Sequence, residues 1–227
     1  MEASLVSDLA TLRVDPALAS LEAFAARHLD DDPGHNLAHA LRVARAAVRL
    51  AASLGACPRE AFAAALLHDL VNVPKDHPDR ALASTRSAEA ARGVLPDFGF
   101  DAGAVDRIAA AITDHSFSRG VVPTHPLGQA LQDADRLEAL GAVGLFRCIS
   151  TGVRMGAAYF HEADPFARTR PLDDRAFSID HFYTKLLRLP ATFLTEAGRA
   201  EAERRAAFLR ATLVQLGDEL GEAPRET

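Results

Sequence analysis

Two side chains with metal-binding chemistry stand next to each other in this sequence. His68 and Asp69 directly follow the apolar run AFAAALL at 61–67. A neutral imidazole and a carboxylate are both good ligands for a divalent metal ion. A polar group that stays unpartnered in an apolar wall costs free energy. His39 and Asp135 stand in similarly apolar surroundings, at 37–43 and 130–137. The sequence therefore offers a quartet of ligands, two nitrogens and two oxygens.

Three members of this quartet also have an ordinary structural alternative. His39 alone could be a core histidine that bonds a backbone carbonyl, and Asp69 alone could cap a helix or form an ion pair. Asp135 alone could pair with Arg136 or Arg42. Their occurrence together favours a metal centre, with room for water or substrate oxygens on a six-coordinate ion. The mixed set suits Mn, Fe, Ni, Co or Zn, and suits Mg less because magnesium prefers oxygen.

Helix signals along the chain indicate how these residues are positioned. Asp15-Pro16 is typical of an N-cap followed by Pro at the first helical position, and Asp32-Pro33 and Cys57-Pro58 indicate two more helix starts. Gly55 predicts the end of the second helix. Apolar and polar residues do not alternate over any long stretch, so no sheet is expected. The predicted helices cover about 16–25, 32–54, 58–69, 80–95, 101–115, 126–140, 141–160 and 179–189, with a long last helix that starts at Pro190.

Several motifs around the quartet resemble one known family. These are HALRVA at 39–44, LLHDLVNVPKDHPDR at 66–80, DHSFS at 114–118, QDADRLEALGAVGL at 132–145, DPFARTRPLDD at 164–174 and DHFYTKLLRLP at 180–190. With the order His39, His68-Asp69, Asp135 they resemble the HD superfamily of metal-dependent phosphohydrolases, in its bacterial YedJ/YpgQ-type group. The resemblance runs from about Pro33 to the last helix.

The resemblance implies an all-α fold, a single HD-domain helical bundle with C-terminal helices packed on it. The expected domain covers 1–221, with an HD core at about 33–140 and a C-terminal helical part at about 141–221, and 222–227 form a disordered tail. The implied activity is metal-dependent hydrolysis of a phosphoanhydride or phosphoester bond of a nucleotide, for example (d)NTP pyrophosphohydrolysis. Manganese is the favoured ion. Alternatives are a nucleotide-binding sensor without turnover, or a two-metal phosphodiesterase or oxygenase.

Cationic and imidazole side chains outside the quartet are candidates for substrate contacts. Lys75, His77 and Arg80 follow the ligand pair in a proline-stiffened loop, where a cation beside a metal suits phosphate, and a solvated surface loop is the alternative. Arg136 and Lys185 are further candidates for stabilising phosphate charge. Like Asp69, Lys75 is assigned a catalytic role.

Two further histidines are expected to act in catalysis. His35 precedes His39 by four residues, so a shared helix face would place it at the metal edge. The related pattern has His-Asp where this chain has His35-Asn36. His115 is expected to bond a phosphate oxygen or donate a proton, and a favourable His⁺ at a helix C-terminus is the alternative. Some enzymes of the resembled superfamily hold a second metal with two added histidines between the His-Asp pair and the last Asp, an interval that here contains His77, His115 and His125, but the resemblance implies a single-metal quartet.

Composition sets limits on partners. The chain has 227 residues, 48% hydrophobic, which suffices for one sizeable core. Its net charge of −6 argues against nucleic-acid polymers, so the expected partner is a small anionic nucleotide, and a homodimer stays open. Cys57 and Cys148 are expected to be reduced thiols. Neither a secretory signal nor a bilayer-length apolar run is visible, so a cytoplasmic protein without membrane contact is expected.

Overall fold

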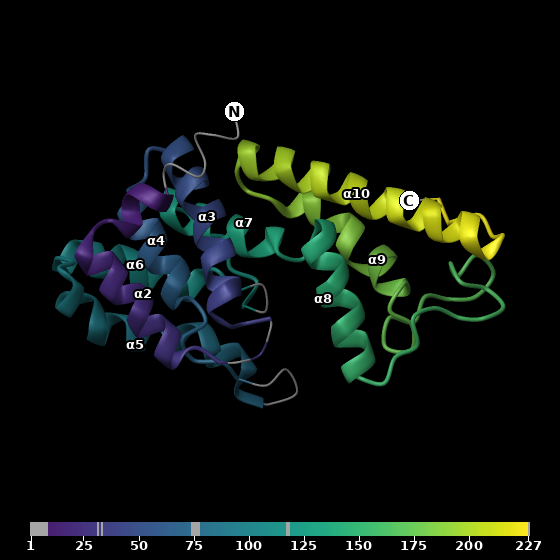
Figure 1. Ribbon diagram of the computed structural model, residues 1–227, viewed down its shortest axis with the longest axis horizontal. Helices are drawn as coiled ribbons and strands as arrows, with labels where there is room; N and C mark the ends of the chain where they lie inside the picture. The colour runs from purple at the N-terminus through teal and green to yellow at the C-terminus, as the bar shows by residue number, and fades with distance from the viewer. Residues whose placement is uncertain (1–8, 31, 33, 74–77, 117–118, 227) are drawn as a thin grey trace. The chain divides into compact units, whose positions relative to one another are not determined.

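The computed structural model describes residues 9–30, 32, 34–73, 78–116 and 119–226 (Figure 1). The predicted all-α fold is confirmed: these residues form helices, and the β pairing among them is an isolated bridge between Ala158 and Phe177. No helix within these ranges is both long and apolar enough to span a bilayer. The chain divides into two compact units, 1–135 and 136–227. The single domain over 1–221 stays a prediction.

The first unit contains helices whose starts are set by local caps. They are α2 (Pro16–His28), α3 (Leu37–Ser53), α4 (Pro58–Leu67), η1 (Pro78–Leu82), α5 (Ala83–Val94), η2 (Leu95–Phe98), α6 (Ala102–Asp114) and α7 (Pro126–Leu137), whose last two residues belong to the second unit. Asp15 caps α2 as predicted, because its Oδ1 accepts from Ala17 N at 2.9 Å. Gly55, at φ 69°, follows the end of α3 as predicted.

The predicted start of α3 at Asp32-Pro33 is wrong. The helix begins at Leu37, because the Asn36 side chain accepts a hydrogen bond from His39 N at 3.1 Å and is the N-cap. Asn and Asp are about equally good in this position. The Asn36 that departs from the related His-Asp pattern therefore has a structural role that either residue type fills.

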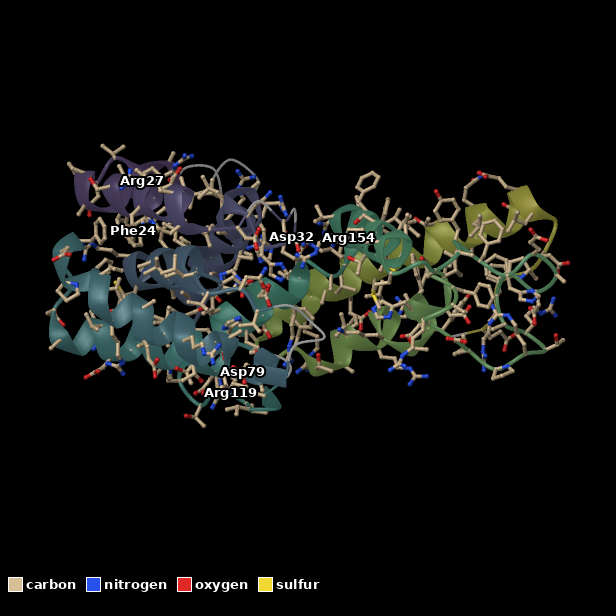
Figure 2. The ribbon with its side chains drawn as sticks, turned by 90° about the horizontal axis from the view of Figure 1, so that it is seen from below. Phe24, Arg27, Asp32, Asp79, Arg119 and Arg154 are labelled. Atoms are coloured by element: carbon tan, nitrogen blue, oxygen red, sulfur yellow. The ribbon has the colours of Figure 1, made fainter. Side chains whose placement is uncertain are left out.

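Helix α4 lies at the centre of the first unit and carries the His-Asp pair at its end. All of its residues from Glu60 to Leu67 are buried, and it packs against α2, α3 and α6. A helix that is apolar on all sides needs such surroundings. At the edge of this core, Phe24 of α2 contacts Phe98 of η2, with ring centroids 5.8 Å apart; Phe24 is labelled in Figure 2.

The second unit contains α8 (Gly141–Arg154), α9 (Asp180–Thr184), η4 (Leu186–Thr192) and α10 (Glu196–Leu220). Here α10 packs against α8 and η4. The prediction that Pro190 starts the last helix is wrong, because Pro190 lies inside η4 and Thr195 caps α10 by accepting from Gly198 N at 2.9 Å. The segment expected to be a disordered tail makes contacts at least as far as Arg225, which donates to the Ala167 carbonyl at 3.1 Å.

Candidate metal centre

The quartet converges at one place in the first unit. His39 lies in the first turn of α3, His68 caps the C-terminus of α4 with Asp69 next to it, and Asp135 is near the end of α7. His39 Nε2 lies 3.3 Å from His68 Nε2 and 3.5 Å from Asp135 Oδ1. His68 Nε2 lies 3.3 Å from Asp69 Oδ2. Donor atoms at these separations are spaced like neighbouring ligands of a single divalent ion, which lie roughly 3–3.5 Å apart.

The burial of the quartet is uneven. The side chains of His39 and His68 are each 1% exposed, whereas those of Asp69 and Asp135 are 22% and 31% exposed. The imidazoles therefore form the closed wall of the cluster and the carboxylates its open side. This arrangement suits an ion that keeps positions for water or substrate oxygens.

Hydrogen bonding prepares His68 to act as a ligand. Its Nδ1 donates to the Ala65 carbonyl at 2.7 Å, so in the neutral ring Nε2 carries the lone pair that faces the cluster. Without an ion, burial lowers the pKa of His68, but the charge and hydrogen bond of Asp69 and the charge of Asp135 outweigh burial and raise the pKa to about 9. An ion that binds Nε2 must therefore displace a proton near neutral pH.

The two carboxylates respond to the same cluster in the opposite direction. Burial raises the pKa of Asp69, but the charge and hydrogen bond of His68 outweigh it and hold this pKa well below its usual value. Burial likewise opposes ionisation of Asp135, and the charges of His68 and His39 lower its pKa. Both carboxylates are ionised at neutral pH, as ligation requires.

His115 is a fifth group in this cluster. It caps the C-terminus of α6, is 5% exposed, and its Nε2 lies 3.9 Å from Asp69 Oδ1. Its Nδ1 donates to the Ile112 carbonyl at 2.6 Å. Burial, followed by the charge of His68, lowers the pKa of His115. At neutral pH Nε2 is therefore a hydrogen-bond acceptor, so this state favours water binding or ligation over the predicted proton donation.

The described residues contain a second triad with ligand spacing. His68, Asp69 and His115 have donor atoms within 4.8 Å of one another, as do His39, His68 and Asp135. Asp69 takes part on both sides, with Oδ2 toward His68 and Oδ1 toward His115. His125 is not in either triad; its Nδ1 accepts from Gly128 N at 3.2 Å at the start of α7.

His35 is close to the quartet for a different reason than its sequence spacing. It precedes the N-cap of α3, so it does not share a helix face with His39, yet the two rings meet edge-on with centroids 6.2 Å apart. Asp32, labelled in Figure 2, precedes it, and Asp32 Oδ2 lies 3.4 Å from His35 Nδ1. The sequence analysis predicted Asp32 as a helix start and not as a partner of His35, for which the signal was its position three residues before that histidine.

The described part of the structure does not show the predicted phosphate-binding residues at one site. Lys75 and His77 lie outside them, and Arg80 lies in η1 with its side chain outside the description. Arg136 and Lys185 belong to the second unit. There the Arg136 guanidinium donates to the Thr192 carbonyl at 2.8 Å, and Lys185 is an exposed residue at the end of α9. Their contacts with substrate stay predictions.

Comparisons with known proteins agree with this geometry. A family model of the HD domain matches residues 36–140. The chain is 33% identical over 203 residues to the uncharacterized protein YpgQ of Bacillus subtilis (strain 168), covering 87% of this chain and 90% of that protein. The crystal structure of Bacillus subtilis YpgQ in complex with ADP is similar, with a TM-score of 0.69, 29% identity, and 89% and 97% of the two chains covered.

A second solved structure extends the similarity. It is a predicted HD superfamily hydrolase from an uncultured Thermotogales bacterium, with a TM-score of 0.58, 29% identity, and 91% of this chain and 92% of that chain covered. The ordered quartet, the family match and the similarity to YpgQ over most of both chains agree with one another: this chain belongs to the HD superfamily.

Proposed function

We propose that this protein is a metal-dependent phosphohydrolase that cleaves a phosphoanhydride or phosphoester bond of a nucleotide. The observation that carries the proposal is the cluster in which two buried imidazoles face two partly exposed carboxylates. That donor set fits a divalent ion on its closed side and leaves the open side for phosphate oxygens. The YpgQ structure with ADP supports a nucleotide as the substrate class.

His39, His68, Asp69 and Asp135 would hold the ion, and manganese is our choice. A divalent ion bound there supplies Lewis acidity toward a phosphoryl oxygen and lowers the pKa of a coordinated water. The chain itself contributes the ionised Asp69 and Asp135, whose lowered pKa values keep them available as ligands. His115 Nε2 presents an acceptor beside Asp69, where it would orient a water molecule.

His35 and the cationic side chains, Lys75 among them, are assigned to the substrate side. His35 is held by Asp32 at the edge of the cluster, and its side chain is 14% exposed, so it is accessible to a ligand. Lys75, His77 and Arg80 follow the ligand pair in sequence, and Arg136 and Lys185 complete the proposed phosphate contacts. Cations at these positions would stabilise charge that develops on the phosphates.

The direct test is a screen for release of phosphate and of pyrophosphate from (d)NTPs and (d)NDPs, with Mn, Mg, Ni or Co added to chelator-treated protein. We expect turnover with manganese that depends on Asp69. Pyrophosphate with a monophosphate product would identify a (d)NTP pyrophosphohydrolase. Nucleotide binding without turnover under every metal would instead indicate a sensor.

A second candidate is a two-metal enzyme, a phosphodiesterase or an oxygenase. The observation that favours it is the triad His68, Asp69 and His115, which shares His68 and Asp69 with the quartet and adds His115. Metal stoichiometry separates the candidates: elemental analysis giving one ion per chain supports the proposed single-metal enzyme, and two ions per chain support the alternative.

A further inference from the structure

Gln132 ties together the two ends of the segment that follows α6. It lies on α7 and is 1% exposed. Its Nε2 donates one hydrogen bond to the Asp114 carbonyl at 3.0 Å and another to the Val121 carbonyl at 3.1 Å. Both amide protons of one side chain are thus used on carbonyls that lie eighteen and eleven residues away.

The orientation of this amide follows from hydrogen-bond chemistry. Only its NH₂ end can face two carbonyl oxygens, since a carbonyl group is an acceptor only. Its Oε1 is consequently left buried, and within the described part of the chain it has no hydrogen-bond partner. Burial of an acceptor without a partner costs free energy. The two bonds made by Nε2 are thus kept although Oε1 gains no bond from the described residues.

The two Nε2 bonds lie next to residues of the candidate metal centre. Asp114 is the residue before His115, and Gln132 precedes the quartet member Asp135 by three residues, which places both on one face of α7. The His115 ring is fixed on one side by its own Nδ1 bond to Ile112. The Gln132 bond to the Asp114 carbonyl fixes the backbone next to His115. This bond therefore couples the placement of His115 to α7, the helix that carries Asp135.

We propose that Gln132 is a positioning residue that holds His115 Nε2 against Asp69 for the phosphohydrolase reaction. This inference rests on the proposed function and deepens it. Gln132 itself does not touch substrate. It sets where the acceptor at Nε2 lies relative to Asp69 Oδ1, now 3.9 Å away, and thus where a water molecule between them would be held. Loss of the two Gln132 hydrogen bonds, here called the Gln132 clamp, should misplace His115 Nε2 without removing a metal ligand.

Gln129 provides a matched control on the same helix. It lies one turn before Gln132, and its Nε2 donates to the Pro123 carbonyl at 3.3 Å. Gln129→Met therefore also removes a side-chain hydrogen bond from α7 to the segment between α6 and α7. The carbonyl it loses belongs to Pro123, and not to Asp114, the neighbour of His115. Gln132→Met keeps the side-chain length and removes both donors. Gln132→Asn is a second variant, too short to reach both carbonyls, in case the methionine variant fails to fold.

The experiment is a double-mutant cycle on the metal-loaded full chain. Using dNTP hydrolysis with Mn, we expect Gln132→Met to lower kcat about tenfold or more, with KM within about threefold and bound metal unchanged. In a His115→Ala background the same change should cost less than about twofold, because neighbours that act through one group are not additive. Equal losses in both backgrounds, loss of bound metal, or an equal loss in Gln129→Met would overturn the proposal.

A second experiment, by NMR spectroscopy, tests the positioning role of Gln132 without depending on hydrolytic activity. Histidine-ring ¹H–¹⁵N NMR spectra are recorded for metal-free and Zn²⁺-loaded protein, with the His115 signals assigned from His115→Ala. Gln132→Met should shift the His115 ring signals more than those of His39 or His68, and more than Gln129→Met does. If the wild type hydrolyses no nucleotide, the proposed function fails while this experiment still reports on the Gln132 clamp. Unshifted His115 signals would overturn the positioning role.

Discussion

The Nε2 atoms of His39 and His68 lie 3.3 Å apart in the interior of the first unit, although 29 residues separate them in sequence. Two ring nitrogens this close need a proton or a cation between them, because two lone pairs repel. Both rings are buried, and the carboxylates of Asp69 and Asp135 approach the same point from the exposed side. The close pair is therefore satisfied by a proton on one of the two Nε2 atoms or by a metal ion that binds both.

Asp69→Ala is expected to abolish metal binding and phosphohydrolase activity while the protein stays folded. The change removes one ligand and one negative charge, leaving two imidazoles and a single carboxylate. The loss in metal affinity should exceed the roughly 10–100-fold that removal of an outer hydrogen-bond partner costs. Elemental analysis, dNTP turnover and a thermal melt measure the three properties.

Asp106→Ala is the control for this variant. Asp106 is also a carboxylate of the first unit, but its side chain is 71% exposed on α6, where it pairs with Arg92. It should keep wild-type metal content and turnover. Normal metal content and activity in Asp69→Ala would remove this residue from the quartet and contradict the metal centre proposed here.

Much of the first unit could be predicted because its signals are local. The predicted helix over 101–115 is found as Ala102–Asp114, since Asp101 caps it by accepting from Ala104 N and its apolar residues repeat at helical spacing. The convergence of His39, His68, Asp69 and Asp135 was expected from the resemblance. Composition alone would not have brought together residues from three helices.

The errors arose where several local signals competed, or where the partner is distant. Asp32 and Asn36 are both good N-caps, and only the structure shows that Asn36 caps α3 while Asp32 turns to His35. Pro190 and Thr195 competed in the same way for α10. Gln132 had no sequence signal, because its two carbonyl partners depend on how α6 and α7 are placed.

Asn36→Ala should destabilise the protein by about 1 kcal/mol, whereas Asn36→Asp should be close to neutral. The alanine leaves His39 N without its capping acceptor, and the aspartate keeps an oxygen in place. Urea unfolding of metal-free protein measures the free energy of unfolding of both variants. A large gain or loss of turnover in Asn36→Asp at unchanged metal content would show that position 36 has a chemical role beyond capping.

Arg170→Ala should destabilise the second unit by about 3–5 kcal/mol, because it leaves a buried carboxylate without its cation. Asp180 is fully buried, and Arg170 Nη2 and Nη1 bond its two oxygens at 2.8 and 2.5 Å. Arg168→Ala, at an exposed neighbour in the same loop, is the control and should stay within about 0.5 kcal/mol of wild type. Urea denaturation followed by circular dichroism compares them, and equal stabilities would contradict the importance of this ion pair.

Metal affinity should fall as the pH is lowered below about 9, by about tenfold for each pH unit at neutral pH. The sign follows from His68: its pKa in the metal-free protein is raised to about 9, so below that pH a proton occupies the Nε2 position that the ion needs. Asp69 and Asp135, whose pKa values are lowered, do not take up protons in this range. Above about pH 9 the proton on His68 no longer competes, so its contribution to the pH dependence of the affinity ends.

Calorimetric titration of Mn²⁺ into metal-free protein, in buffers of different ionisation enthalpy, counts the protons released. We expect His68 to contribute about one proton per ion near pH 7.5, and a smaller number as the pH approaches 9. His28→Gln, a change at an exposed histidine of α2 outside the cluster, should leave this count unchanged and so assign the proton to the quartet. A pH-independent affinity without proton release would mean that His68 is neutral in the metal-free protein, and that the charges of Asp69 and Asp135 do not govern its imidazole.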